Sequence, residues 1–280
     1  MSTATVATSN DLSALTHDFN TLGFAVIRQM LRPDEVATIR DAFMEEARNG
    51  PVEGLSEMLR RDGEYDPTDP LHFYPRMMHP HRHPQKRVGQ LAMQYMLDRR
   101  LYAPLKAFMQ DEPVAVQSMF YFKPPGARGQ ALHQDNYYLR VKPGTCCAAW
   151  FAIDDADFEN GGMVVVPGTQ NMEVVCPQQA DKTRFFTEDY VPVPEGFSEQ
   201  PVELKAGDVL FFNGSLVHGS YPNQSKTRFR RSLICHYAPM NARELSRWYT
   251  ERLTFDGRQA HFDDVSDGGP CGGEFQTRPH

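Results

Sequence analysis

The chain has 280 residues, a formal net charge of −7, 40% hydrophobic residues and 23% charged residues. These values are typical of a globular protein that can close a large core. The acidic balance argues against nucleic acid or an anionic membrane as a partner, and no apolar run approaches the roughly 20 residues of a membrane-spanning helix.

The first part of the chain has helical periodicity. The Asn-Asp pair at residues 10–11 is expected to cap a short helix that ends near Gly23, and residues 24–27 follow as a strand. Pro33, with acidic residues directly behind it, opens a second helix. Residues 88–109 carry apolar residues at helical spacing and are expected to form one or two helices.

Residues 51–86 are irregular and rich in Pro, Asp, Arg and His. Long segments of this kind are often lids or binding loops, and we expect a lid here. His79, His81 and His83 are alternate residues and offer a rival metal site, but prolines interrupt them and no carboxylate or cysteine lies among them. A solvated lid loop is therefore favoured.

Beyond residue 113 the periodicity changes to that of short strands separated by turns. Hairpins are expected at the Asn-Gly-Gly turn of residues 160–162 and between residues 202 and 212. Residues 171–198 are a second lid candidate, and residues 244–253 are expected to be helical. Strands are expected at residues 114–122, 146–153, 163–166, 202–204, 209–212 and 231–237, and in the segment that carries His133 and Asp135.

Helices followed by regularly spaced strands predict a mainly β fold with flanking helices, as an antiparallel sandwich or jelly roll. We expect one domain spanning residues 1–280, with loose ends at residues 1–9 and 263–280. The oligomeric state is not predicted.

The N-terminus and the cysteines favour a cytoplasmic location. The first ten residues are small and polar and lack the pattern of a signal peptide. The cysteines are odd in number and form no CxxC pair, so reduced thiols are favoured over disulfides. They are Cys146, Cys147, Cys176, Cys235 and Cys271.

The sequence His133-Gln134-Asp135 is the strongest candidate for chemistry. In an extended strand, His133 and Asp135 would point to one face and Gln134 to the other. His218 lies 83 residues beyond Asp135, behind the apolar run 209–212. Two histidines and one carboxylate that leave coordination positions open are diagnostic of non-haem Fe(II) oxygenases.

A carboxylate-binding group also follows His218. Arg230 lies 12 residues beyond it, and a planar guanidinium suits the distant carboxylate of a 2-oxo acid that binds the metal. Ser220 can add a hydroxyl donor. Arg228 and Arg231 are alternatives to Arg230, although strand alternation places Arg231 on the opposite face from Arg230.

Several motifs resemble the phytanoyl-CoA dioxygenase family. The resemblance covers roughly residues 15–240 and implies a double-stranded β-helix, a jelly-roll core like that of cupins. It further implies Fe(II), O2 and 2-oxoglutarate, which is decarboxylated to succinate and CO2 while a C–H bond of a small molecule is hydroxylated or otherwise oxidised. The motifs are Leu-His-Gln-Asp at 132–135, Ala-Trp at 149–150, Asn-Gly-Gly at 160–162 with residues 164–169, His-Gly-Ser at 218–220 and Phe-Arg-Arg-Ser-Leu at 229–233.

Carried over position by position, the resemblance implies that His133, Asp135 and His218 are the metal ligands. Asp135 favours hydroxylation or a related oxidation, because halogenating relatives have a small residue at this position. The implied co-substrate contacts are Arg230 and Ser220 to the distal carboxylate, Trp150 along the pocket, and Gln117 and Gln130 at polar positions.

Other residues near the motif allow two interpretations. Tyr137, Tyr138 and Arg140 line the mouth of a substrate site or form an exposed β-ribbon, and His236 is expected to be structural. The mixed Arg, His, Tyr and Phe content of the lid candidates favours a polar or amphipathic metabolite, and no patch for coenzyme A is evident.

Two other kinds of protein could use some of the same residues. A non-catalytic jelly-roll protein with a binding or regulatory role would keep the metal site without turnover. Such a protein has no physical need to retain both histidines, the carboxylate and the inward arginine. A cupin-type metal enzyme would require a second histidine two residues after the first and a glutamate soon after, which the residues following His133 do not supply.

Overall fold

The computed structural model describes residues 10–57, 68–265 and 271. The expectations for residues 1–9, for part of the first lid candidate and for most of the C-terminal stretch lie outside this part of the chain.

The helices expected in the first part of the chain are confirmed. The side chain of Asp11 accepts a hydrogen bond from the backbone of Ala14, and Gly23 ends the first helix with a φ of 86°, a conformation that glycine adopts readily. Residues 88–109 divide into two helices at Asp98, whose side chain caps the second. The helices are α1 (Leu12–Leu22), α2 (Pro33–Glu46), α3 (Pro70–Phe73), α4 (Arg87–Met96), α5 (Arg99–Met109) and α6 (Asn136–Leu139), with 3-10 turns η1 (Pro80–Arg82) and η2 (Thr169–Asn171).

Two antiparallel sheets form the centre of the fold. The seven-stranded sheet has the order β1 (Phe24–Ile27), β10 (Val209–Asn213), β5 (Cys147–Ala152), β12 (Ser232–Pro239), β3 (Pro113–Tyr121) and β14 (Leu253–Thr254), with β2 (Met77–Met78) also paired to β3. The four-stranded sheet has the order β4 (Gln130–His133), β11 (His218–Ser220), β6 (Met163–Val165) and β9 (Gln200–Val202). Two small sheets pair β7 (Gln178–Gln179) with β8 (Asp189–Tyr190) and β13 (Glu244–Ser246) with β15 (Asp263–Val265).

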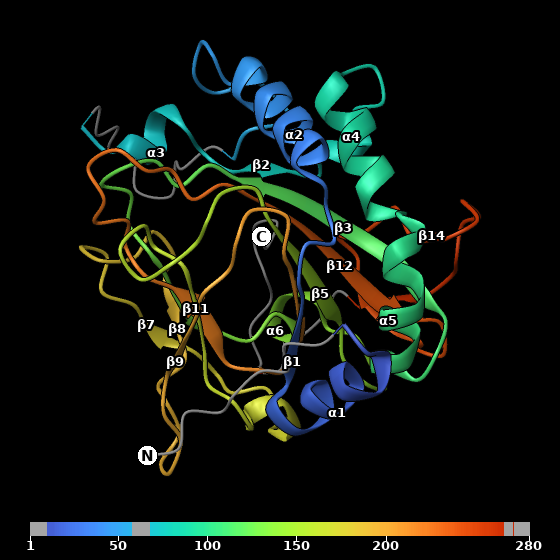
Figure 1. Ribbon diagram of the computed structural model, residues 1–280. Helices are drawn as coiled ribbons and strands as arrows, with labels where there is room; N and C mark the ends of the chain where they lie inside the picture. Colours follow the sequence, from blue (N-terminus) through green and yellow to red (C-terminus); the bar gives the residue numbers. More distant parts are fainter. Residues whose placement is uncertain (1–9, 58–67, 266–270, 272–280) are drawn as a thin grey trace.

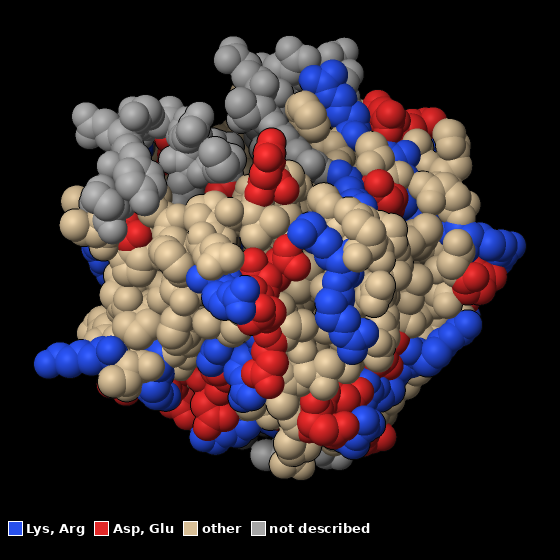
Figure 2. All heavy atoms as spheres, turned by 90° about the horizontal axis from the view of Figure 1, so that it is seen from above, with Lys and Arg blue, Asp and Glu red and all other residues tan. Residues whose placement is uncertain are grey.

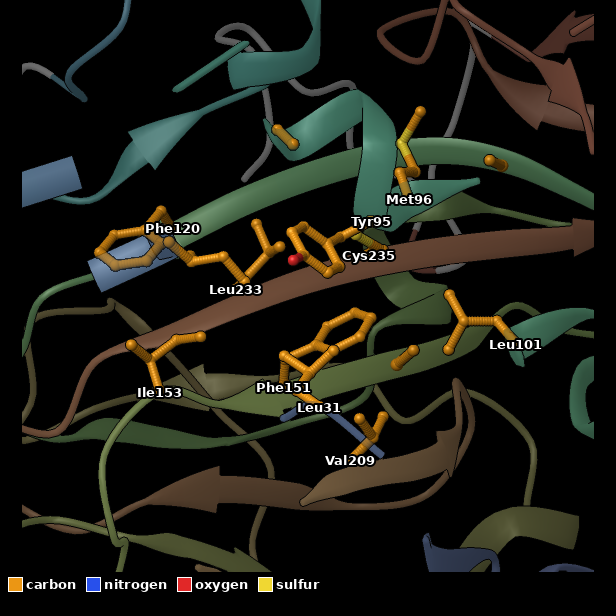
Figure 3. Packing of buried hydrophobic residues seen from close by; sticks show 14 of the residues in the cluster. Leu31, Tyr95, Met96, Leu101, Phe120, Phe151, Ile153, Val209, Leu233 and Cys235 are labelled. Carbon is orange, nitrogen blue, oxygen red and sulfur yellow. The ribbon is translucent and has the colours of Figure 1, made fainter. Parts of the chain in front are cut away.

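Strand alternation gives the large sheet two apolar faces. Phe151, Leu233 and Phe120 point outward into the cluster that includes α1, α2, α4 and α5 (Figures 1 and 3), and Phe120 stacks on Phe43 of α2 at 3.9 Å between ring centroids. Trp150 and Ile234, on the other face, pack inward with Met163 of the small sheet. The helices therefore cover one side of the large sheet and leave the other side facing the small sheet, as in a jelly roll.

The two predicted hairpins are wrong. Gly161 does take up a turn conformation, with a φ of 81°, but it connects β5 of the large sheet to β6 of the small sheet. Strands β9 and β10 likewise belong to different sheets. Turn residues indicate where the chain reverses, but the inter-sheet packing selects the pairing partner.

Residues 244–253 are not helical. Glu244–Ser246 forms β13, which pairs in parallel with β15 at Asp263–Val265, and Leu253–Thr254 extends the large sheet beside β3. The start of the stretch expected to be loose is thus a strand. In the described part of residues 51–86, β2 pairs with β3, so this part is more ordered than expected.

The expectation of reduced thiols is wrong for two of the five cysteines. Cys176, in the second lid candidate, forms a disulfide with Cys271, 95 residues further along the chain. Cys146, Cys147 and Cys235 are free and buried. The cytoplasmic location stays a prediction.

No helix in the described ranges has the length and apolarity to cross a bilayer. Basic and acidic side chains lie next to one another on the face shown in Figure 2, so this face carries no broad field of one sign.

Candidate metal centre and adjoining pocket

The register of two neighbouring strands brings the two histidines of the motif together. His133 on β4 and His218 on β11 are directly paired across the antiparallel ladder, so their side chains share a face. Their ring centroids are 4.3 Å apart. Gly219 allows this close pairing, since a Cβ atom there would lie 2.8 Å from the carbonyl oxygen of Gln130.

Both imidazoles are held in one tautomer. Nδ1 of His133 lies 2.8 Å from the carbonyl of Ala131, and Nδ1 of His218 lies 2.9 Å from that of Leu216. A carbonyl only accepts, so each Nδ1 donates and each Nε2 keeps its lone pair for a ligand. Burial lowers the pKa of His218 to about 4, which keeps this ring neutral at physiological pH.

Asp135 reaches the same point by a different route from the expected strand. Strand β4 ends at His133, and Asp135 has helical dihedral angles, φ −60° and ψ −34°. Its carbonyl accepts from the backbone of Tyr138 at 2.9 Å and of Leu139 at 3.1 Å. The alternation argument for Asp135 is therefore wrong, and a turn into α6 brings its carboxylate beside the histidines.

The ligand atoms of His133, Asp135 and His218 lie within 4.8 Å of one another, and all three residues are buried. One carboxylate oxygen, Oδ1, is 3.4 Å from Nε2 of His133 and 3.6 Å from Nε2 of His218. Although burial opposes ionisation, the neighbouring His218 and His236 rings hold the pKa of the Asp135 carboxyl well below its usual range. An ionised carboxylate and two neutral imidazoles suit Fe(II).

A pocket extends from this cluster between the two sheets. Its described lining includes every residue carried over from the family motif, and also Tyr138 of the three candidate substrate residues, but not Tyr137 or Arg140. Strand alternation places Met119 and Tyr121 on the same face as Gln117, a signal that sequence reasoning left unused. The lining also includes Tyr249, which no local pattern indicates.

Arg230 lines the same pocket as Asp135. It is 2% exposed, its Nε donates to the carbonyl of Gly161 at 3.0 Å, and its guanidinium lies 5.2 Å from the centre of the Trp150 ring. Burial lowers its pKa to about 10, so the group stays charged at neutral pH. Its hydrogen-bond partners in the described residues are neutral oxygens.

The other two arginines are engaged elsewhere. Arg231 pairs with Asp154 at 2.8 Å, and Arg228 pairs with Asp157 and Glu159 at 2.8 and 2.7 Å. Of the three alternatives, only Arg230 is among the residues that line the pocket.

Lys123 is a buried residue that sequence reasoning missed. It is 4% exposed, and its ammonium group donates to Ser220 Oγ at 2.8 Å, to the carbonyl of Gly161 at 3.1 Å and to the carbonyl of Tyr221. Burial, followed by the charge of Arg230, holds the pKa of Lys123 well below its ordinary value. Positive charge is therefore costly here until an anion lies nearby.

Residues 171–198, the second lid candidate, are hydrogen-bonded to the segment that follows His133. Gln134 points away from the cluster, as expected, and its side chain bonds the backbone of Val175 at 2.7 Å. Tyr138 lines the pocket and its hydroxyl donates to Asp189 of β8 at 2.7 Å. Gln130 lies 3.1 Å from Nε2 of His133. Residues 171–198 are thus held against residues next to the site, although none of them is among the described lining residues of the pocket.

The rival histidine site is not formed. Among the described residues, the only group suited to a metal is His133, Asp135 and His218. His79 is buried with no hydrogen-bond partner for either ring nitrogen, and Nδ1 of His81 lies 2.6 Å from Ser118 Oγ. These histidines are packed into the protein instead of lying on a solvated loop.

His81 is expected to make the protein less stable in acid. Burial, aided by Arg82 and His83, lowers its pKa to about 3, so between pH 6.5 and pH 3 the unfolded chain binds a proton that the folded chain excludes. The free energy of unfolding should fall by about 2 kcal/mol from this residue between pH 7 and pH 5. Urea unfolding at pH 7 and pH 5 should show a smaller fall in the free energy of unfolding for His81→Gln than for the wild type. Equal falls in the wild type and in His81→Gln would contradict this prediction.

The family model described as phytanoyl-CoA dioxygenase (PhyH) matches residues 19–232. A curated relative, phytanoyl-CoA dioxygenase 1 of Oryza sativa subsp. japonica, is 31% identical over 144 residues, covering 50% of this chain and 51% of the relative. The peroxisomal phytanoyl-CoA dioxygenase of Bos taurus is 24% identical over 236 residues, covering 78% of this chain and 66% of the relative. The chain thus spans about half the length of the first of these relatives.

Solved structures share the fold at low sequence identity. AviO1 from Streptomyces viridochromogenes Tue57 has a TM-score of 0.62 and 23% identity, covering 84% of this chain and 98% of AviO1. The epimerase SnoN, solved in complex with Fe3+, alpha ketoglutarate and nogalamycin RO, has a TM-score of 0.63 and 20% identity, covering 83% of this chain and 85% of SnoN. The predicted jelly-roll architecture is confirmed by these similarities.

Proposed function

Because this chain belongs to the phytanoyl-CoA dioxygenase family of Fe(II)/2-oxoglutarate-dependent oxygenases, we propose that it hydroxylates, or otherwise oxidises at a C–H bond, a small-molecule metabolite. O2 and 2-oxoglutarate would be consumed as in that family, with Fe(II) as the bound cofactor and with release of succinate and CO2. The observation that carries the proposal is one pocket that is lined both by the two-histidine, one-carboxylate cluster and by Arg230.

The residues of the pocket divide into two roles in this proposal. His133, Asp135 and His218 would hold the iron, which supplies the oxidising chemistry when bound. Arg230 and Ser220 would hold the distal carboxylate of 2-oxoglutarate, with Trp150 under the guanidinium and Gln117 and Gln130 along the walls. A buried guanidinium whose described partners are neutral oxygens favours a ligand that carries a carboxylate.

Lys123 would act behind this carboxylate by orienting Ser220. Ser220 Oγ accepts from Lys123 at 2.8 Å and from the backbone of Gln130 at 3.3 Å, which leaves the serine O–H free to donate into the pocket. We expect Lys123→Met to raise the KM for 2-oxoglutarate by about tenfold, the loss of one charged hydrogen bond. Steady-state succinate release against 2-oxoglutarate concentration measures this, and an unchanged KM contradicts it.

The walls around the metal-binding cluster support a polar or amphipathic substrate. Tyr121, Tyr138 and Tyr249 line the pocket together with Gln117 and Gln130. Tyrosine presents an apolar ring and a polar hydroxyl, which suits a compound of mixed polarity better than a plain hydrocarbon chain. Tyr137 and Arg140, on and after α6, would act only indirectly.

The proposal is tested by mixing the protein with Fe(II) and 2-oxoglutarate without oxygen. The visible charge-transfer band of the chelate is expected. With oxygen, succinate release should rise when the correct metabolite is added from a panel of polar and amphipathic compounds. No band overturns the proposal, and a band with no turnover on any compound favours the non-catalytic alternative.

A further inference from the structure

His236 lies directly behind the carboxylate of Asp135. It is on β12 and is 2% exposed, and its Nε2 is 2.9 Å from Oδ2 of Asp135. The other oxygen, Oδ1, is the one that faces His133 and His218 at 3.4 and 3.6 Å. The two oxygens of one carboxylate therefore have different neighbours.

The hydrogen atom in this contact belongs to the histidine. An ionised carboxylate only accepts, so Nε2 of His236 must donate. Nδ1 of His236 has no hydrogen-bond partner in the described part of the chain, so the bond to Asp135 is the one bond that the ring makes there. Rotating the carboxylate would leave a buried N–H unsatisfied, which is unfavourable.

This arrangement matters because a carboxylate can bind a cation through one oxygen or both. Two histidines and one carboxylate oxygen leave room for a chelating 2-oxo acid and for oxygen. A carboxylate bound through both oxygens would occupy a position that one of these needs. A donor that engages Oδ2 prevents that.

We propose that His236 is a positioning residue that holds Asp135 as a one-oxygen metal ligand. The inference rests on the proposed function and extends it to a residue that the sequence placed in the core. Strand alternation accounts for its location, because Ile234 and His236 lie on the same inward face of β12 and both line the pocket. Removal of such supporting groups typically weakens metal binding by about 10–100-fold.

Three variants test whether His236 acts through its N–H donor or only by filling space. His236→Gln keeps an N–H at a similar reach, whereas His236→Leu removes it at similar volume. His81→Gln is the matched control, since His81 is also buried at 2% and bonds Ser118 on the same strand pair instead of a ligand. Where the leucine variant fails to fold, His236→Asn replaces it, because its amide is too short to reach Asp135.

The first measurement is Co(II) binding to the metal-free protein, followed by absorbance. We expect His236→Leu to bind about 10–100-fold more weakly than the wild type, His236→Gln to recover most of the loss, and His81→Gln to match the wild type. The Fe(II) and 2-oxoglutarate band should also shift in His236→Leu but not in His81→Gln. Equal Co(II) affinity in all proteins, or equal loss in the glutamine and leucine variants, overturns the inference.

The Co(II) measurement and the Fe(II)–2-oxoglutarate band test this inference and the proposed function separately. A wild-type protein that binds Co(II) but gives no band with Fe(II) and 2-oxoglutarate overturns the proposed function. The order of Co(II) affinities among the variants still decides the role of His236 in that case.

Discussion

Asp135→Ala is expected to abolish the Fe(II)–2-oxoglutarate band and succinate release. Asp135 supplies the only carboxylate of the cluster of described residues suited to a metal, and two neutral imidazoles alone are a weak site for a hard cation. Metal affinity should fall by more than the roughly 100-fold that loss of a supporting group costs. Anaerobic titration with Fe(II) at saturating 2-oxoglutarate measures the effect.

His218→Ala should give the same result, because it removes one of the two Nε2 donors. His81→Ala serves as the control for loss of a buried histidine that contacts Ser118 instead of the cluster, and it should keep the band. Thermal unfolding of each metal-free variant shows whether the fold survives. A wild-type band in folded Asp135→Ala or His218→Ala would show that the metal lies elsewhere.

Arg230→Met is expected to raise the KM for 2-oxoglutarate by about 10–100-fold. A hydrogen bond to a charged group contributes about 1.5–3 kcal/mol, and each 1.4 kcal/mol is tenfold in affinity. Since the guanidinium would contact the co-substrate and not the reacting C–H bond, kcat at saturating 2-oxoglutarate should change far less. Steady-state kinetics with varied 2-oxoglutarate separates the two quantities.

Arg228→Met and Arg231→Met are matched controls, because both arginines are paired with acids outside the pocket. Their KM for 2-oxoglutarate should remain close to that of the wild type. A second comparison uses 2-oxobutyrate, which lacks the distal carboxylate. The preference for 2-oxoglutarate over this acid should largely disappear in Arg230→Met. A rise in the KM for 2-oxoglutarate that is confined to Arg231→Met would instead assign binding of the distal carboxylate to Arg231.

The disulfide bears on how both experiments are performed. Cys176 lies in residues 171–198, the segment that also holds Asp189 against Tyr138. Reducing agents are commonly added with Fe(II), so each titration needs the wild type under the same reducing conditions as its variants. Variant effects are then compared in one covalent state.

The sequence by itself determined the features that depend on a few neighbouring residues. The cap at Asp11, the stop at Gly23 and the division between helices and strands follow from short-range hydrogen bonds and periodicity. Alternation along one strand also separated Arg230 from Arg231, one buried in the pocket and the other paired with Asp154. Such information is local, so no partner strand is needed to read it.

Only the tertiary structure decided which distant segments meet. The direct pairing of His133 with His218, the bond from His236 to Asp135 and the β13–β15 pair join residues that are far apart in the chain. Residues 244–253 were misread because their partner strand overrides a weak helical pattern. Asp135 was assigned to a strand, yet a helical turn presents its carboxylate. The motif thus indicated the candidate ligands, while the packing of the two sheets brought their side chains together.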